Sequence, residues 1–559
     1  MKTASKPTKF YFISIATLIL LALNIYATKA LVIFGSPILF AFALLLEVVL
    51  LGVFIYSLVR SLTTPESIIK SLFVSILGGL ASNDYVKKLS KSKSPLLTWA
   101  KCRLRKNSPY GLPLTLTLLM ATIFLVNFLS VLITVSSKGS LSHVDTRVLN
   151  LMPSIRTPAQ TAFFRVVTAL ANTETAILLM VATAAVLWQR HQRFLAGLVI
   201  VVAGGEEVVT YIIKHLVMRM RPDRVLSLFK EGGFSFPSGH SVWATVLFGL
   251  LAYFIYKSYT STRARLLTVG LYVLTVFLVA LSRIYMGVHY PSDVWGGILL
   301  GGSMLTLVIG VLEIGSRYKI IGNKKLDVTN KTILAVPVLL VVFSMIASPF
   351  FIHIQPAMVS PAYTVVPTID ETTVQKLPLY SETLTGSRME PINFIYAGSE
   401  EQIVTTFLTH GWYRADPSTL SNTLKALAVG FQGRQYLTAP VTPSYLNFKP
   451  ENIAFEQSTA THSLKQRHHT RLWRTNLALP DGRPIWVATA SFDEGVEFAG
   501  SAKLPTHHID PNIDAERAYI IKSLGLQSNP IAVVQPQLGK NASGDSFFTD
   551  GKAELVFLK

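Results

Sequence analysis

Nine apolar stretches that are long enough, or nearly long enough, to cross a lipid bilayer dominate the first 352 residues of this chain. A helix that crosses about 30 Å of hydrocarbon needs about 20 apolar residues. The stretches lie at 10–31, 36–59, 112–135, 173–189, 194–213, 240–256, 266–282, 292–313 and 333–352. Because 50% of the residues are hydrophobic and only 15% are charged, a disordered chain is excluded. The sequence therefore predicts a multi-span α-helical membrane protein.

The excess of positive over negative charge lies in the apolar part of the chain. The formal net charge is +20, yet the residues from Gln355 to the end hold 17 Lys and Arg against 19 Asp and Glu. Basic residues such as those between Lys87 and Lys106 fall in the loops expected on the cytoplasmic side, as the positive-inside rule requires. With an uncleaved first span and a cytoplasmic N-terminus, nine spans place the C-terminal region outside. The charge thus indicates a membrane partner and no nucleic acid.

The residues after the last apolar stretch form a separate soluble domain of mixed α and β structure. A linker with four prolines opens it, and strands are expected at 394–396, 485–492 and 532–535. Helices are expected after Ser399, which is a capping residue, and at 515–524. The single cysteine, Cys102, excludes a disulfide within the chain.

Two cationic residues close the fifth span. Lys214 precedes Arg221-Pro222 by seven positions, and the two side chains share a helical face if that helix continues. Such a pair suits an anionic ligand. The alternative is a pair of snorkelling anchors at the headgroups.

A second motif, Pro237-Ser238-Gly239-His240, opens the sixth span. Ser238 is predicted to cap the helix, and Gly239 permits a close approach of the backbone to a ligand. The free amides of the first helical turn make an anion site. A plain helix cap with an incidental histidine is the alternative.

The third motif joins Ser282-Arg283 to His289 and Asp293 around the start of the eighth span. Pro291 is expected in the first helical turn, so Asp293 lies near the helix N-terminus and within reach of the imidazole. A carboxylate that holds one imidazole nitrogen leaves the other as a nucleophile. The alternative is an interfacial histidine beside a capping aspartate.

Together the motifs bring cations, a helix N-terminus and two histidines to one side of the bilayer, which suits phosphoryl transfer without a metal ion. The three motifs resemble those of the type 2 phosphatidic acid phosphatase and haloperoxidase superfamily over roughly 113–315. The resemblance implies a six-helix core in which His289 attacks phosphorus, Asp293 orients it and His240 protonates the leaving group. It also implies that Lys214, Arg221, Arg283, Ser238 and the Gly239 amide hold the phosphoryl oxygens, and that no metal or other cofactor is needed.

The C-terminal domain resembles the LssY-type domain that accompanies such phosphatases in bacteria, through the stretches 467–473 and 507–517. Five of the twelve histidines lie between His462 and His508. A metal or phosphate site there is one interpretation, and an ordinary solvated cluster with His469, Arg471 and Trp473 on one strand face is the other. The partner of this domain is left open.

The resulting domain prediction has four parts: two N-terminal transmembrane helices and a basic cytoplasmic loop at 1–111, the phosphatase-like transmembrane domain at 112–315, a linker and last helix at 316–354, and the soluble LssY-like domain at 355–559. The resemblance implies hydrolysis of a lipid phosphomonoester or pyrophosphate, of the undecaprenyl pyrophosphate, phosphatidic acid or phosphatidylglycerol phosphate type, with the site facing the periplasm of a bacterial inner membrane. The alternatives are phosphoryl transfer to a lipid or sugar acceptor and a non-catalytic envelope interaction protein.

Three aromatic residues between the first two motifs, Phe229, Phe234 and Phe236, are expected either to line the lipid's path to the site or to anchor the loop. Two carboxylates within the fifth span, Glu206 and Glu207, are expected to be a buried ion pair or protonated acid, with a role beside Lys214 as the alternative.

Overall fold

The computed structural model consists of two compact units, one formed by residues 82–359 and the other by 1–81 together with 360–559. It describes residues 6–31, scattered positions between 46 and 79, and 82–558 with gaps at 92–93, 106–107, 138–140, 224–225, 318–330, 355–362, 385, 418–421, 423–424, 427, 430–434, 448, 460–465, 500–503 and 543. Each unit is described by itself.

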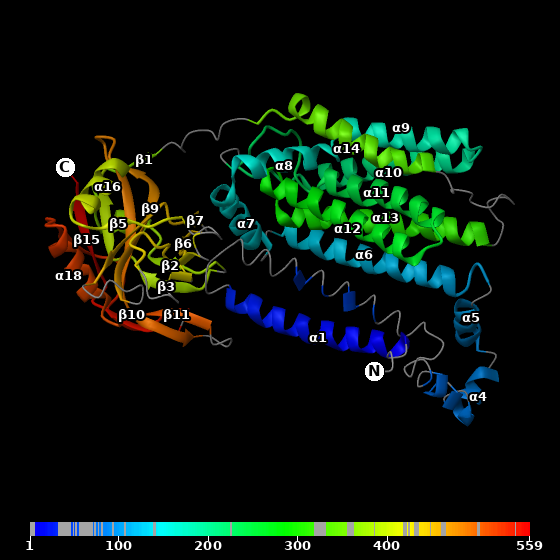
Figure 1. The fold of residues 1–559 in the computed structure, drawn as a ribbon, viewed down its shortest axis with the longest axis horizontal. Helices are drawn as coiled ribbons and strands as arrows, with labels where there is room; N and C mark the ends of the chain where they lie inside the picture. Colours follow the sequence, from blue (N-terminus) through cyan, green and yellow to red (C-terminus); the bar gives the residue numbers. More distant parts are fainter. Residues whose placement is uncertain are drawn as a thin grey trace. The chain divides into compact units, whose positions relative to one another are not determined.

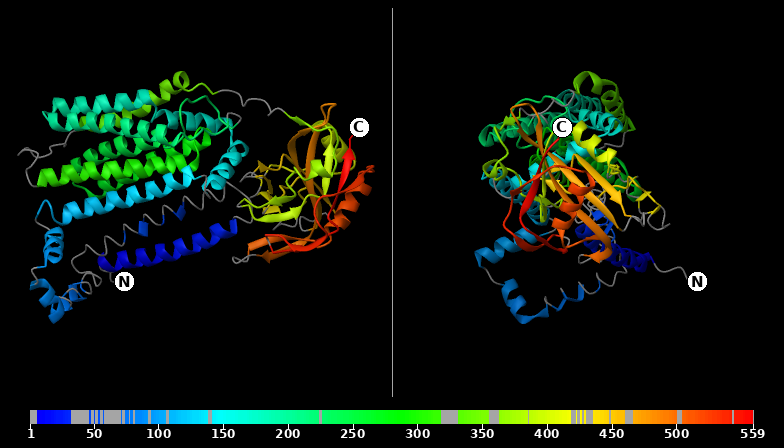
Figure 2. Two further views of the ribbon diagram at one scale, coloured as in Figure 1. Left: turned by 180° about the vertical axis from the view of Figure 1, so that it is seen from behind. Right: turned by 90° about the vertical axis from the view of Figure 1, so that its left-hand side faces the viewer.

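The unit of residues 82–359 is helical (Figure 1). Its helices are α4 (Asp84–Lys91), α5 (Pro95–Leu104), α6 (Leu112–Ser136), α7 (Leu141–Ile155), α8 (Pro158–Ala169), α9 (Thr173–Gln189), α10 (Arg193–Val217), α11 (Gly239–Ser258), α12 (Thr262–Tyr285), α13 (Pro291–Arg317) and α14 (Lys331–Phe351). α13 packs against both α6 and α11, and α10 packs against α9 (Figure 2).

Five of these helices, α6 and α10 to α13, are long and apolar enough to cross a membrane. α8 and α9 meet at a 46° bend and make a sixth span if they are taken as one. With that pair counted as one span, the helices over 112–317 provide six spans, the number that the resemblance implies. α14 and α1 (Lys6–Leu31) overlap the last and first predicted spans, but their described apolar stretches are shorter, and most of the predicted span at 36–59 lies outside the described residues.

Two glycines let α11 and α13 approach each other where the site lies. A Cβ atom at Gly297 would come within 2.7 Å of the Ser238 carbonyl oxygen, and one at Gly301 within 2.8 Å of the Thr245 side chain. Only glycine therefore fits at these two positions without a shift of the neighbouring helix. This close packing fixes the N-terminus of α11 against the first turns of α13.

The fifth span ends earlier than the Lys214 and Arg221 spacing requires for a shared helical face. α10 stops at Val217, and Met218 adopts a left-handed conformation with φ 50°. Its amide still donates to the Lys214 carbonyl oxygen at 2.9 Å, which closes the last helical turn. The chain then leaves the helix axis, so Arg221 lies in a loop, and the condition for a helical face shared with Lys214 is not met.

The unit that includes residues 360–559 holds a nine-stranded sheet with the order β12-β15-β4-β10-β9-β8-β5, to which β1 and β11 add at β9 and β10. Its strands are β1 (Thr364–Val365), β4 (Phe394–Ala397), β5 (Tyr413–Arg414), β8 (Ile453–Ser458), β9 (Arg467–Ala478), β10 (Pro484–Ala499), β11 (Leu504–Ile509), β12 (Asn529–Ala532) and β15 (Lys552–Phe557). A four-stranded sheet of β2 (Tyr380–Glu382), β3 (Arg388–Pro391), β6 (Tyr445–Leu446) and β7 (Lys449–Pro450) and the pair β13 (Gln537–Lys540) and β14 (Ser546–Thr549) accompany it.

Three helices complete this unit: α15 (Glu371–Val374), α16 (Glu400–Thr409) and α18 (Ile513–Ser523). Ser399 caps α16 in a capping box with Gln402, as its sequence position predicts. The mixed α and β character is confirmed, as are the strands expected near 394 and 485 and the helix near 515. The strand expected at 532–535 was wrong, because β12 ends at Ala532.

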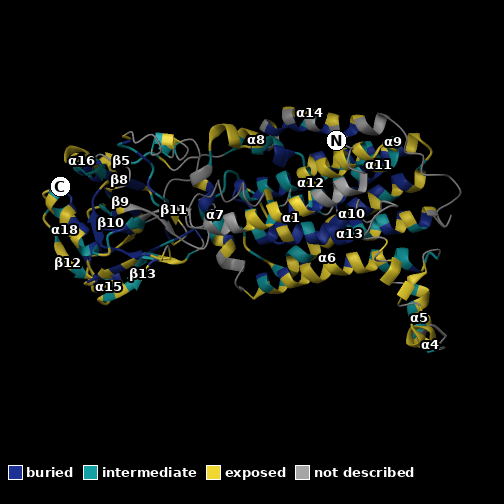
Figure 3. Cartoon of the chain, turned by 60° about the horizontal axis from the view of Figure 1, so that its bottom comes forward, coloured by how far each residue is buried: buried dark blue, intermediate teal, exposed yellow. Residues whose placement is uncertain are grey.

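The apolar faces of the central strands are filled with aromatic side chains. Trp473 and Trp486 are among the largest fully buried residues, and both belong to the β9–β10 pair. Figure 3 shows buried residues along the strands of this unit. Large aromatic side chains contribute much of the buried apolar area of a core. The sheet therefore has its own hydrophobic core.

Candidate active site

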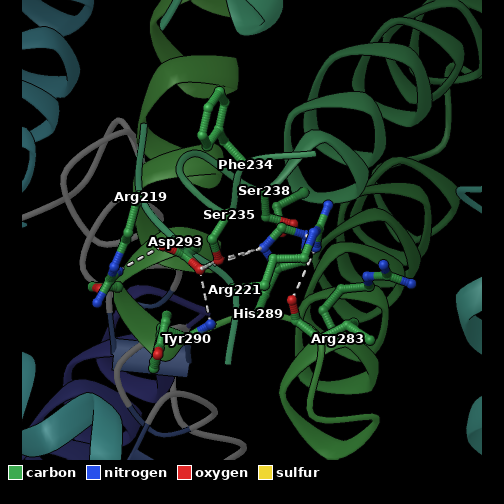
Figure 4. Close-up of polar contacts among 12 residues, drawn as sticks. Arg219, Arg221, Phe234, Ser235, Ser238, Arg283, His289, Tyr290 and Asp293 are labelled. Carbon is green, nitrogen blue, oxygen red and sulfur yellow. Dashed lines mark hydrogen bonds and ion pairs between the residues drawn. The ribbon is translucent and has the colours of Figure 1, made fainter. Parts of the chain in front are cut away.

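The three sequence motifs meet at one end of the helical bundle, where α10 and α12 end and α11 and α13 begin. All the predicted site residues lie there: Lys214, Arg221, Ser238, Gly239, His240, Arg283, His289 and Asp293. Ser238, Arg283, His289 and Asp293 are almost completely buried. Residues that are as many as 79 positions apart in the chain thus share one polar site (Figure 4).

His289 lies between a carboxylate and a guanidinium. Its Nδ1 is 3.4 Å from Asp293 Oδ2, and its Nε2 is 3.1 Å from Arg221 Nη1 (Figure 4). Asp293 also accepts the Tyr290 backbone N–H at 2.8 Å and the hydroxyl of Ser235. These contacts fix the orientation of the carboxylate and leave Nε2 facing the cationic side of the site.

The protonation of His289 is set by this environment. Burial lowers the pKa of the His289 imidazole well below its usual value, and the charges of Arg221, Arg283 and Lys214 lower it further. The neutral imidazole therefore predominates at pH 7. A neutral ring with Nδ1 held by the carboxylate presents an unprotonated Nε2, which is the state that a nucleophile requires.

A third arginine, Arg219, is not part of the motifs but holds the Asp293 carboxylate in place. Arg219 donates through Nη1 to Asp293 Oδ1 at 2.6 Å and through Nη2 to Asp145 Oδ2 at 2.7 Å. Burial lowers the pKa of Arg219, but the two carboxylates outweigh it, so the net shift is upward. Asp145 also accepts the Ser292 backbone N–H at 2.9 Å. α7 is thereby connected to the start of α13.

Arg221 and Arg283 share one carboxylate. Glu231 Oε1 lies 3.3 Å from Arg221 Nη2 and 4.0 Å from His289 Nε2, while Oε2 accepts a hydrogen bond from Arg283 Nη2. Arg283 is further held by Thr168 Oγ1 at 2.7 Å. Glu231 therefore lies between the two guanidiniums and the imidazole nitrogen, a position where negatively charged oxygens are stabilised.

The remaining predicted residues contact backbone or neighbouring amides. Lys214 Nζ donates to the Phe234 carbonyl oxygen at 2.7 Å, and His240 Nε2 lies 3.0 Å from Asn172 Oδ1. Among the described contacts, no hydrogen bond joins His240 directly to His289.

Ser238 occupies the N-cap position of α11, but its side chain makes no capping hydrogen bond. Its hydroxyl instead accepts from Ser241 Oγ at 3.1 Å, and its backbone N–H donates to the Asp293 carbonyl oxygen at 3.0 Å. Ser238 is therefore the N-cap residue, as predicted, and the helix begins at Gly239, although the Ser238 hydroxyl does not bond to the first helical amides. The contact to Asp293 joins the second motif to the third.

The aromatic residues between the first two motifs differ in their roles. Phe236 is completely buried and stacks on Phe128 with ring centroids 5.9 Å apart, so it anchors the loop. Phe229 lies against the Arg283 guanidinium at 5.5 Å from the ring centroid. In α10, Glu206 is completely buried, while Glu207 accepts a hydrogen bond from Trp243 Nε1 at 2.9 Å.

Four polar residues of the site were missed from the sequence: Arg219, Asp145, Ser235 and Glu231. Arg219 stands two positions before Arg221, and Ser235 and Glu231 lie in the loop that joins the first two motifs. This proximity was the only available signal. Asp145 is 148 positions before Asp293 in an unremarkable polar segment, so nothing in the sequence pointed to it.

Two models of known families match parts of this chain. Residues 194–314 match the model of the PAP2 superfamily, and residues 374–553 match the model described as the LssY C-terminus. The chain therefore carries a PAP2 superfamily domain followed by an LssY C-terminal domain.

Two proteins that are similar to this chain in sequence are named as phosphatases. The chain is 36% identical over 124 residues to phosphatidylglycerophosphatase B of Bacillus subtilis, which is 22% of this chain and 60% of that protein. It is 36% identical over 112 residues to decaprenylphosphoryl-5-phosphoribose phosphatase of Mycobacterium tuberculosis, which is 18% of this chain and 53% of the relative. The chain thus spans between half and three fifths of the length of these two relatives.

A solved structure also matches. It is a transmembrane PAP2 type phosphatidylglycerolphosphate phosphatase from Bacillus subtilis, with 27% sequence identity and a TM-score of 0.33. The match covers 35% of this chain and 96% of that one.

Proposed function

We propose that the protein is an integral membrane lipid phosphatase that hydrolyses a lipid phosphomonoester or pyrophosphate through a phosphohistidine intermediate. The observation that carries the proposal is the position of His289, with Nδ1 toward Asp293 and Nε2 toward Arg221. A histidine oriented by a carboxylate and facing cations suits attack on a phosphoryl group.

Each step of the proposed reaction is assigned to particular residues of the site. His289 Nε2 attacks phosphorus, and the bond from phosphorus to the leaving oxygen breaks as the new P–N bond forms. Arg221, Arg283 and Lys214 stabilise the negative charge on the phosphoryl oxygens, and His240 gives a proton to the leaving oxygen. Water then attacks the phosphohistidine, His240 takes up a proton from that water, the P–N bond breaks, and inorganic phosphate leaves with His289 and His240 restored. The proposal assigns no step to a metal ion.

The substrate class follows from the place of the site among helix ends. A lipid headgroup can reach this depth while its acyl or prenyl chain stays in hydrocarbon. Undecaprenyl pyrophosphate, phosphatidic acid and phosphatidylglycerol phosphate are the proposed substrates, and the phosphatase names of the relatives support this class. We place the site and the C-terminal domain on the periplasmic face of a bacterial inner membrane, on the positive-inside distribution of basic loops.

The test is phosphate release by detergent-purified protein from a panel of these lipid phosphates in the presence of EDTA. Release that resists EDTA supports a metal-independent phosphatase and ranks the substrates. Release that appears only when a lipid or sugar acceptor is added identifies a transferase instead. Absence of release under both conditions, with folded protein, contradicts both enzymatic proposals.

Replacement of Glu231 by glutamine is expected to strengthen inhibition by inorganic phosphate about fivefold. The carboxylate of Glu231 bridges the guanidiniums of Arg221 and Arg283, so a phosphate group must displace it. Removal of one such charge pair, partly exposed, changes binding by roughly 1 kcal/mol. The measurement is the inhibition constant of phosphate against a lipid substrate. Asp223→Asn, which changes an exposed carboxylate of the same loop, is the control. Weaker phosphate binding in Glu231→Gln contradicts the prediction.

The acid limb of kcat/KM is expected to lie below pH 6.5, the usual pKa of histidine. Because burial and the neighbouring cations lower the pKa of His289, the nucleophile stays neutral as the pH falls through that value. The measurement is a pH profile of kcat/KM, corrected for the second ionisation of the substrate phosphate. A limb at or above pH 6.5 that belongs to the enzyme contradicts the prediction.

A further inference from the structure

The LssY C-terminal domain contains a polar cavity that the phosphatase chemistry does not use. The cavity lies between the β9–β10 pair, the β2–β3 hairpin and the turn from β13 to β14, and among its lining residues are Glu390, Arg471, Asp493 and Asp545. These four side chains belong to residues that are at least nine-tenths buried. The burial of a charge costs free energy unless a partner compensates it, so each of these four side chains is expected to have a compensating partner.

Two of the four charges are paired within the domain. Arg467 donates through Nε to Asp493 Oδ2 at 3.2 Å and also binds Glu456. His508 Nδ1 lies 2.8 Å from Asp545 Oδ1. Asp493 and Asp545 therefore have compensating partners of their own.

Arg471 and Glu390 lack such partners. Arg471 donates through Nε to the Thr442 carbonyl oxygen at 3.0 Å, and Glu390 Oε1 accepts from Asn541 Nδ2 at 3.0 Å. Neither of them forms an ion pair in the part of the chain that the structure describes, although Arg471 is 8% and Glu390 3% exposed. Burial raises the pKa of the Glu451 carboxyl, and the charge of Arg471 opposes that shift; Glu451 also accepts the Ser444 backbone N–H at 3.0 Å. One guanidinium and one carboxylate thus line the same cavity without an ion-pair contact to any described residue.

We propose that this cavity binds a small zwitterion that carries an oxyanion and a primary ammonium group. The oxyanion binds Arg471, because a guanidinium presents several N–H donors to a carboxylate or phosphate. The ammonium group binds Glu390, since an ammonium donates to carboxylate oxygens. Such a ligand compensates both buried charges at once, which neither a simple anion nor a simple amine can do. The same chemistry is found in a free amino acid and in a phosphoethanolamine headgroup.

The test is calorimetric titration of the full-length protein in detergent. The free zwitterions are glycine, β-alanine, γ-aminobutyrate and O-phosphoethanolamine, and the single-charge probes are acetate and ethylamine. The headgroup probe is dihexanoyl phosphatidylethanolamine. All titrations use the His289→Ala background, so that phosphate hydrolysis contributes no heat.

At least one zwitterion is expected to bind, and more than tenfold more tightly than either single-charge probe. Arg471→Gln and Glu390→Gln should each weaken that binding at least tenfold, whereas Arg471→Lys should retain part of it. The matched controls are Arg474→Gln, on the same strand, and Glu400→Gln, on the surface of α16; both should leave the affinity unchanged.

The outcomes separate the two sources of ligand. Binding of the free zwitterions assigns a soluble ligand, and binding of the lipid probe alone assigns a headgroup. Absence of binding by every probe overturns the proposal, as does equal affinity in the His289→Ala parent protein and in its folded Glu390→Gln variant. The proposal is also overturned if binding is lost only in variants that no longer show a thermal unfolding transition, because that loss reports unfolding and not the missing charge. Arg471→Lys, which keeps the positive charge, is the folded reference for this comparison. None of these outcomes depends on whether the phosphatase proposal holds.

Discussion

Replacement of His289 by alanine is expected to lower kcat for lipid phosphate hydrolysis by at least about a thousandfold. Nε2 of the His289 imidazole lies 3.1 Å from Arg221 Nη1, and the carboxylate of Asp293 lies beside Nδ1 on the opposite edge of the ring. Alanine removes the nitrogen atom that bonds to phosphorus, and a water molecule in its place is not held in the same orientation for attack. The measurement is phosphate release under saturating substrate.

His215→Ala is the control for this prediction. His215 is exposed near the end of α10 and hydrogen-bonds the Tyr211 carbonyl oxygen, outside the proposed reaction. Its replacement should leave kcat within about threefold of wild type. Activity of His289→Ala within tenfold of wild type contradicts the assignment of the nucleophile. A phosphohistidine trapped in alkaline denaturant from wild type, and missing from His289→Ala, tests the intermediate directly.

Replacement of Arg219 by methionine is expected to destabilise the protein by about 3–5 kcal/mol and to reduce activity with it. Arg219 pairs with Asp145 and Asp293, which are 1% and 0% exposed. Methionine of similar length leaves two buried carboxylates without their cation. Asp293 would then lose the contact that holds it toward His289, so kcat should fall even in molecules that remain folded.

The measurements are thermal unfolding in detergent and kcat of the folded fraction. Arg219→Lys restores one positive charge without the forked geometry, and it should recover part of the stability. Arg263→Met, an exposed position at the start of α12, is the control and should change neither quantity. Unchanged unfolding of Arg219→Met would show that the Asp145 contact contributes little.

The sequence predicted what depends on short separations along the chain. Span positions follow from runs of apolar residues, and α9 occupies the predicted stretch at 173–189. His289 and Asp293 are four positions apart around a helix start that Pro291 marks, so their proximity follows from helical geometry. The strand at β9 and the cap at Ser399 are likewise local features.

Only the tertiary structure decided which distant groups complete the site. The left-handed turn at Met218 moves Arg221 off the α10 helix, and a hydrophobicity pattern does not register a single backbone angle. Asp145 reaches Arg219 because α7 packs beside α13. Glu231 reaches both arginines from a loop that is tied to the end of α12 by the hydrogen bond from the Leu228 N–H to the Met286 carbonyl oxygen. The sequence by itself determined the membrane spans and the residue types of the chemistry. The pairing of buried charges depends on packing between segments far apart in the chain, which no local pattern encodes.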